Sequence, residues 1–159
     1  MMKNDEQLTD LIVKEVVKQM NEQSAKLGLK KAKDLIERVE QYVQKKGVSA
    51  VIAVCDVSGN PIAVHVMDGA YLVSFDVAMK KAYSAVAVKM STLELGKLAQ
   101  VGGGFQGLDK LEADKMVFFG GGIPLMKNGC LVGALGISGG SGEVDHEIAV
   151  YGARSFEEM

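Results

Sequence analysis

Near its start the chain places apolar residues three or four positions apart among polar ones. The members of this stripe are Leu8, Leu11, Ile12, Val16 and Met20. Such spacing predicts a short amphipathic helix over about residues 5–20. The period is lost over residues 21–28, where polar residues and a glycine are typical of a linker. We therefore expect residues 1–24 to form a helix that is separable from the rest of the chain.

The pattern that follows predicts a single domain over residues 29–159. Its first helix is expected over residues 30–46, where five apolar residues form one stripe. They are Ala32, Leu35, Ile36, Val39 and Val43. Two runs rich in β-branched residues follow at 49–57 and 61–68, and the turn residues between them predict an antiparallel hairpin.

Small residues dominate the next helical pattern, which spans about residues 74–95. Ala78, Ala82 and Ala85 recur with helical spacing, and short side chains let a helix approach its neighbour closely. Residues 96–114 are rich in glycine and show no clear period, so we expect a long surface loop containing about one helical turn.

Three further strands are expected before the last helix, which should span about residues 143–156. The strands are residues 115–119, 123–127 and 130–138, and an Asn-Gly pair predicts a tight hairpin between the last two. The complete order of elements predicts an α+β fold in which a five-stranded antiparallel sheet is flanked by helices.

Composition and charge narrow the classes of function. Hydrophobic residues make up 48% of the 159 residues and charged residues 24%, which is typical of a globular domain and not of a disordered one. The formal net charge is −2 and basic residues form no long run, so nucleic acid is not an expected partner. Cys55 and Cys130 lie in apolar runs and predict buried thiols without metal-ligand spacing.

No stretch approaches the ~20 apolar residues of a membrane span, and the start of the chain lacks a secretory pattern. We expect a cytoplasmic protein that does not bind a membrane.

Two glycine-rich segments are candidates for ligand binding. Ser138, Gly139 and Gly140 end a strand and open a helix, so their backbone N–H groups could receive an anionic group; a tight strand-to-helix turn is the alternative. Gly121 and Gly122, just before Pro124, either bring the backbone close to a ligand or form a bulge that bends the sheet.

Histidines and carboxylates supply the remaining candidate chemistry. His65 and His146 are each a potential ligand of haem iron or another metal, although a hydrogen-bonded strand histidine and a solvated helix-start histidine are the alternatives. Asp68 ends a strand and could act as an acid or cap a turn. No nucleophile, phosphate-loop or metal-binding motif predicts catalysis.

Four short motifs occur in order along the chain. They are Met67–Ala70, Lys81 with Ala82, Gly120–Leu125, and Gly133–Gly140 followed by Asp145. Together they resemble the haem-binding and glycolate-utilisation G-type family, which also forms the C-terminal domain of the propanediol-utilisation type of cobalamin adenosyltransferase. The resemblance covers about residues 29–156.

The resemblance implies a profilin-like fold, assembly into homo-oligomers and, in some members, binding of a tetrapyrrole such as haem; a corrinoid is a second candidate. Members that bind haem use a histidine, and because helix 30–46 contains none, His65 and His146 are the candidate ligands. The expected ligand-binding positions are Met67, Asp68, Lys81, Gly121, Gly122, Pro124, Ser138, Gly139, Gly140 and Asp145. Adenosyl transfer is not expected, because the ATP-binding domain has no counterpart in this chain.

The N-terminal helix lies outside this resemblance. Its apolar anchors Leu8, Leu11, Ile12 and Val16, followed by a linker, resemble the encapsulation peptides that tether cargo to shell proteins of bacterial microcompartments. The alternative is that this helix packs on its own domain or on a second copy.

We therefore favour a non-catalytic, oligomeric accessory protein that binds a tetrapyrrole or a small anionic ligand and resides in the lumen of a diol or glycerol utilisation microcompartment. One alternative is an enzyme that degrades haem or processes a small hydroxy acid, with Asp68, Lys81 and Asp145 as the candidate residues. A structural or assembly protein is the other.

Overall fold

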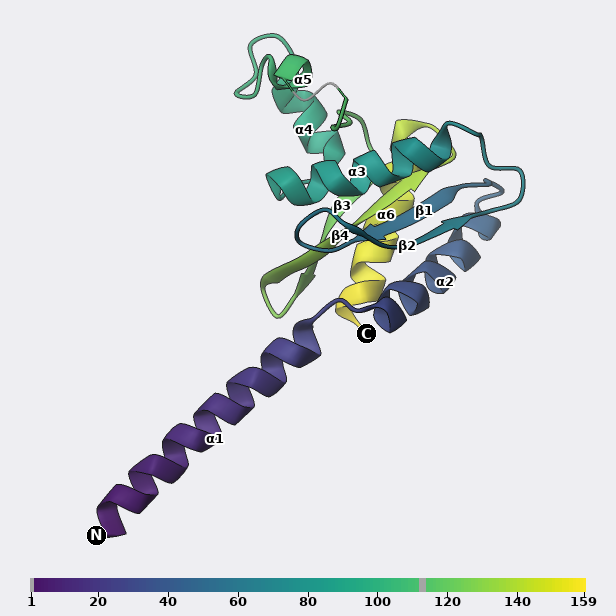
Figure 1. Cartoon of the computed structure of the whole chain (residues 1–159). Coiled ribbons are helices and arrows are strands. Elements are labelled where there is room, and N and C mark those ends of the chain that lie inside the picture. The colour runs from purple at the N-terminus through teal and green to yellow at the C-terminus, as the bar shows by residue number, and fades with distance from the viewer. Residues whose placement is uncertain (1, 112–113) are drawn as a thin grey trace.

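The computed structural model describes the backbone of residues 2–111 and 114–159, and the side chains of residues 7–18, 26–111 and 114–159. Six helices and four strands are assigned in these ranges (Figure 1). The helices are α1 (Met2–Ala25), α2 (Leu29–Lys45), α3 (Ser74–Val88), α4 (Thr92–Ala99), α5 (Leu108–Leu111) and α6 (Gly142–Glu157). The strands are β1 (Val51–Cys55), β2 (Pro61–Val66), β3 (Gly122–Lys127) and β4 (Cys130–Ser138).

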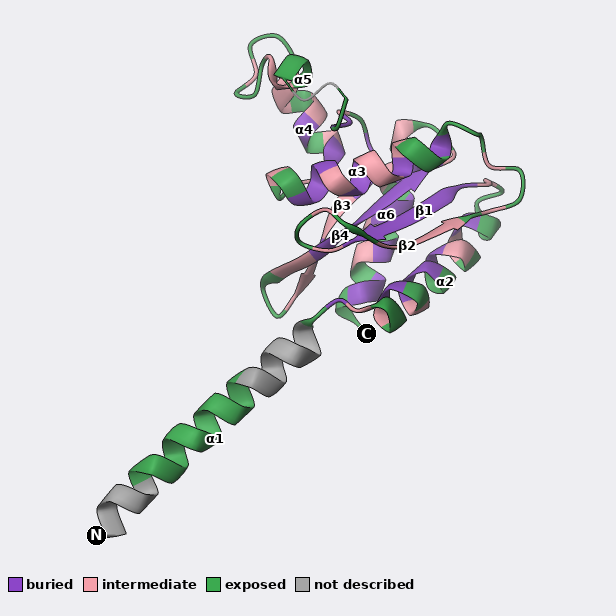
Figure 2. Cartoon of the chain, in the orientation of Figure 1, coloured by how far each residue is buried: buried purple, intermediate pink, exposed green. Residues whose placement is uncertain are grey.

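The four strands form one antiparallel sheet in the order β2-β1-β4-β3. Helices α2 and α6 cover one face and α3 lies across the other (Figure 1). All five residues of β1 are buried, because this strand has a neighbour on both edges and a helix on both faces (Figure 2). The expected α+β class and antiparallel sheet are therefore confirmed.

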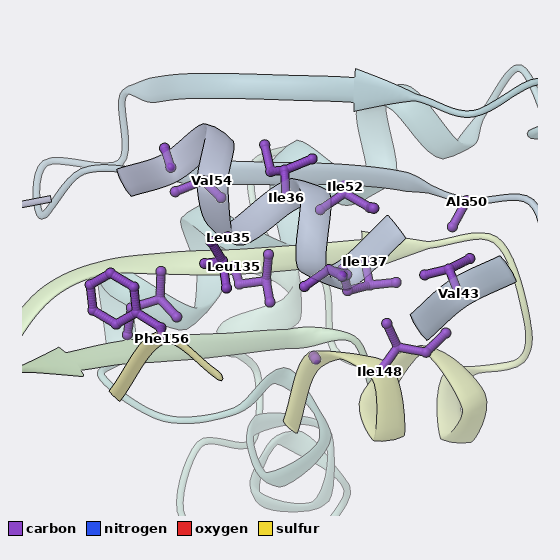
Figure 3. Packing of buried hydrophobic residues seen from close by; sticks show 14 of the residues in the cluster. Leu35, Ile36, Val43, Ala50, Ile52, Val54, Leu135, Ile137, Ile148 and Phe156 are labelled. Atoms are coloured by element: carbon purple, nitrogen blue, oxygen red, sulfur yellow. The ribbon is translucent and has the colours of Figure 1, made fainter. Parts of the chain in front are cut away.

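The main hydrophobic core fills the space between the sheet and the helices α2 and α6 (Figure 3). The stripe predicted on the first domain helix is fully buried there, as its spacing implied. Ile52 and Val54 of β1 face this core, whereas Val51 and Ala53 face α3, so the strand alternates between two apolar layers.

Helix α3 lies unusually close to the sheet because both surfaces carry small residues. Ala78, Ala82 and Ala85 are buried at this contact, as predicted. On the strand side, a Cβ placed on Gly136 would come within 2.0 Å of the carbonyl oxygen of Ala78. Since that oxygen belongs to the backbone of α3, the helix has no room to accept a side chain there.

Both predicted hairpins are present. Asn128 and Gly129 adopt positive φ angles of 52° and 76°, as a two-residue hairpin turn requires. In the other turn, the Asp56 carboxylate accepts hydrogen bonds from the backbone N–H groups of Ser58 and Asn60 at 2.8 and 3.0 Å. These hydrogen bonds lower the pKa of Asp56, and the bond from the Asn60 N–H group has the largest effect.

The predicted fifth strand, residues 115–119, is wrong: in the described part of the chain this segment joins no sheet. Met116 and Val117 are buried, which explains the apolar pattern. However, the N–H group of Val117 donates to Ser84 Oγ of α3 at 2.8 Å. The carbonyl oxygen of Phe118 lies where a Cβ on Gly96 of α4 would be. The segment therefore packs on helices, and the sheet of the described residues has four strands and not the five predicted.

The single helix expected over residues 74–95 is divided into α3 and α4. Lys89 adopts a left-handed conformation with φ 56° and ends α3. Ser91 then begins α4 by accepting a hydrogen bond from the N–H of Glu94 at 3.2 Å. This serine and glutamate form the sequence pattern of a capping box, a start signal that the alanine periodicity concealed.

Helix α1 projects away from the rest of the chain (Figure 1). It is longer than the predicted residues 5–20, and its described side chains, those of residues 7–18, are all exposed. Leu11 is 65% exposed and Val16 48% exposed. The side chain of Met20 lies outside the described residues.

Two further expectations are resolved by the structure. Cys55 is a buried thiol, but Cys130 is exposed at the start of β4, directly after the hairpin turn, so the prediction of a second buried thiol is wrong. No helix in the described ranges is long and apolar enough to cross a membrane.

Replacing Gly136 by alanine should destabilise the domain. The added methyl group would overlap the Ala78 carbonyl oxygen, and such overpacking costs about 1–3 kcal/mol. Gly104→Ala is the matched control, because nothing lies within 4 Å of its Cβ position and its φ is not positive. Urea unfolding should show a lower midpoint for Gly136→Ala alone. Equal midpoints for both variants would contradict the close approach.

Candidate ligand-binding site

Lys81 of α3 and Asp145 of α6 meet at the end of β4, at the edge of the sheet where the glycine segments gather. Lys81 Nζ donates to Asp145 Oδ2 at 2.7 Å and to the carbonyl oxygen of Ile137 at 2.8 Å. The two side chains are only 0% and 2% exposed. A buried ion pair of this kind has to satisfy its remaining polar groups internally.

The glycine loop after β4 satisfies the second oxygen of the Asp145 carboxylate. Asp145 Oδ1 accepts hydrogen bonds from the N–H groups of Gly139 and Gly140 at 3.1 and 2.8 Å. The N–H groups that the sequence offered to an anionic ligand are thus bound to a carboxylate of the chain itself. An external anion would have to displace Asp145 to reach them.

Gly121 and Gly122 line the other side of the same ion pair. A Cβ on Gly121 would lie 2.7 Å from Lys81 Nζ and 2.5 Å from the Ile137 carbonyl oxygen. Gly122 donates its N–H group to Thr92 Oγ1 of α4 at 2.8 Å. These glycines bring backbone close to Lys81, so the site is closed by main chain on this side.

The electrostatic setting of Lys81 is dominated by its burial. Burial lowers the pKa of the Lys81 ammonium, and the Asp145 carboxylate partly offsets this by stabilising the charged form. The ammonium also lies 4.8 Å from the centre of the Phe119 ring, a favourable cation–π contact. Every contact of Lys81 is therefore directed within the protein.

The other predicted ligand-binding residues do not share this position. Ser138 is buried and its hydroxyl bonds to that of Ser74 at 3.2 Å. Pro124 is half-buried in β3, and Met67 packs against the main core. Asp68 is exposed in the turn after β2.

His65 lies on the edge strand β2, on the face covered by α2. Its Nδ1 is 2.7 Å from Glu40 Oε1 of α2, and the imidazole is 35% exposed. A carboxylate on one ring nitrogen fixes the orientation of an imidazole, and metal-binding histidines are commonly held in this way. This contact leaves Nε2 as the nitrogen that a metal or haem iron would meet.

His146 lies near the start of α6, just after its first turn, and has a different environment. Its Nδ1 is buried without a hydrogen-bond partner among the described residues. Burial, followed by the nearby charge of Lys97, lowers its pKa and favours the neutral imidazole. In the part of the chain that the structure describes no carboxylate orients this ring, so His146 lacks the arrangement that His65 has.

Three side chains of these sites were not predicted from the sequence: Thr92, Phe119 and Glu40. Thr92 follows the capping serine of α4, so recognition of that helix start would have placed it near the glycines. Glu40 lies on the polar side of the α2 stripe, and only the pairing of β2 with β1 brings His65 beside it. Among the described residues no group of three or more histidine, cysteine or acidic side chains forms a metal site.

Replacing Lys81 by methionine should cost about 3–5 kcal/mol of unfolding free energy, because the buried Asp145 carboxylate loses its cation. Adding Asp145→Asn should recover part of the loss, since asparagine is neutral and still accepts hydrogen bonds from the glycine loop. Lys80→Met is the control: its surface pair with Asp76 should contribute at most about 1 kcal/mol. Chemical unfolding of wild type and the three variants measures these losses, and equal losses for Lys80→Met and Lys81→Met would refute the prediction.

Relatives of this chain carry the same domain in different contexts. An uncharacterized 15.0 kDa protein in the dhaT-dhaS intergenic region of Citrobacter freundii is 34% identical over 139 residues, which are 87% of this chain and 98% of that protein. The corrinoid adenosyltransferase PduO of Salmonella typhimurium is 42% identical over 114 residues, which are 72% of this chain. The match covers only 33% of PduO.

A solved structure of a PduOC:heme complex superimposes with a TM-score of 0.77 at 37% identity, covering 82% of this chain and 94% of the other. The family model for haem degrading proteins of the HbpS-like type matches residues 27–154. The resemblance noted from the four motifs is thus confirmed, and the chain belongs to the HbpS-like family of haem degrading proteins.

Proposed function

We propose that this protein binds a tetrapyrrole, with haem as the first candidate, as an oligomeric accessory protein without catalytic activity of its own. The observation that carries the proposal is the His65–Glu40 contact at 2.7 Å on the edge strand of the sheet. It offers an oriented, partly exposed imidazole in a family one of whose relatives is solved with haem bound.

Exposed apolar residues follow His65 along the chain, at the end of β2 and in the loop after it, although Val66 pairs with Val51 and so points to the face opposite His65. Val66 is 57% exposed, and Tyr71 and Leu72 in the following turn are 70% and 96% exposed. Their exposure at the edge of the sheet leaves apolar surface that a partner could cover. A second copy covering this edge would bury both the residues and the tetrapyrrole, which supports assembly into a homo-oligomer.

The burial of Lys81 and Asp145 favours a non-catalytic role. Both side chains are enclosed and their polar atoms are bound within the protein, so neither is positioned to contact a substrate. Haem degradation is the second candidate, and membership of a family of haem degrading proteins favours it. Incubating the haem complex with a reductant and oxygen separates the two, because only an enzyme would bleach the Soret band with multiple turnovers.

Iron ligation by His65 is tested by titrating the variants with haem. His65→Ala should lose the low-spin spectrum, and Glu40→Gln should weaken haem binding about 10–100-fold because the imidazole is no longer oriented. His146→Ala is the matched control and should leave the spectrum unchanged. An unchanged spectrum in the His65→Ala, His146→Ala double variant would exclude histidine ligation.

We further propose that residues 1–24 tether the protein to a microcompartment shell protein in the compartment lumen. Leu8, Leu11, Ile12 and Val16 are each about half or more exposed on α1, so their burial is left to a partner. Burying each such side chain in a groove would contribute about 1.5–3 kcal/mol.

A fluorescent reporter fused to residues 1–24 should form puncta in cells that make shells. The Leu11→Glu, Ile12→Glu version should remain diffuse, because the charges would have to be buried in the groove. The domain without residues 1–24 should keep its melting temperature within a few degrees. Diffuse fluorescence from both fusions, or a melting temperature lowered by tens of degrees, would contradict the tether.

A further inference from the structure

A hollow of about 310 Å³ lies between α3 and the β1–β2 hairpin. Its floor is formed by β1 and by Ala82 of α3, and its sides by Met79, Tyr83 and Pro61. It lies on the face of the sheet that α3 covers, whereas His65 contacts Glu40 on the α2 face. The hollow is therefore separate from both the ion pair and the proposed iron ligand.

Small residues create this space. Ala53 and Ala82 face it from the strand and the helix, and neither side chain is long enough to fill it. Gly59 adopts a φ of 80°, and a Cβ there would lie 2.6 Å from Tyr83 Cδ2. The turn thus packs directly against the tyrosine ring at the wall of the hollow. The hollow opens to solvent, and its apolar floor beside an aromatic wall has the composition of a ligand pocket.

The chemistry of the lining selects an uncharged ligand. The floor is apolar, and burial raises the pKa of the Cys55 thiol to about 11, which keeps it neutral. At the rim, two aspartates and two lysines balance each other, and Lys80 Nζ already pairs with Asp76 Oδ2 at 2.7 Å. A charged ligand would have to compete with that pair, whereas a neutral hydroxyl can hydrogen-bond beside it.

We propose that this hollow binds a small, uncharged, ring-sized molecule that carries a hydroxyl group. Its ring packs between Met79 and the face of Tyr83, and its hydroxyl reaches the polar rim. The volume lies at the lower end of the range of small-molecule pockets, which suits one ring and not a tetrapyrrole.

Alanine-methyl NMR spectra of the full chain titrated with para-cresol test the proposal. The Ala53 and Ala82 methyl signals should shift saturably, and that of Ala149, buried in the core on the other face, should not. para-Toluate, which has the same ring with a carboxylate, should bind at least about tenfold more weakly. Equal shifts at Ala149, no saturation, or equal affinity for para-toluate would overturn the proposal.

Met79→Trp should fill the hollow and abolish the saturable shifts. Met90→Trp, also at a half-buried position but outside the lining, is the matched control and should preserve them. If Met79→Trp does not fold, Met79→Ala provides the second arm: it removes one wall and should weaken para-cresol binding several-fold. Full affinity in a folded Met79 variant would overturn the assignment.

Discussion

The enclosed pair of Lys81 and Asp145 is the constraint on which the architecture depends. It joins the helices on opposite faces of the sheet, and the end of β4 passes between them. The charges are tolerated only because the glycine loop and the Ile137 carbonyl satisfy their remaining hydrogen bonds. The two glycine-rich segments at 120–122 and 139–140, which looked independent in the sequence, therefore surround one cluster, in which a side chain at several positions would collide with backbone or with the pair.

This organisation explains which parts of the fold could be predicted. The α2 stripe, the two hairpins and the small face of α3 are local patterns, and each appears where its periodicity placed it. The strand predicted for residues 115–119 was wrong because an apolar run indicates burial but not which element provides it. The N–H group of Val117 binds a serine of a helix and not a neighbouring strand. The break between α3 and α4 at Lys89 was not predicted because the alanine periodicity continues across it. The capping pattern that begins with Ser91 is present in the sequence and would have indicated it.

The candidate residues show the same division. The motifs named Lys81, Asp145, Gly121 and Gly139 as ligand-binding positions, but they could not reveal that these residues gather around one ion pair and bind one another. Whether a loop N–H faces solvent or a carboxylate depends on the helix that follows, which spacing alone does not specify. Conversely, the sequence made both histidines equally good candidate ligands. Only the packing of α2 on β2 distinguishes them, because it places Glu40 beside one of the two, His65.

The Asp145 contact with the loop has a consequence for specificity. The two N–H groups and the Lys81 ammonium form a carboxylate-binding site, and the carboxylate that occupies it is the side chain of Asp145. The fold holds the Asp145 carboxylate at a high effective concentration beside the loop, so dissolved carboxylates compete poorly for the two N–H groups. The glycine loop can thus remain insensitive to changes in cellular organic acids, even though its backbone has the form of an anion receptor.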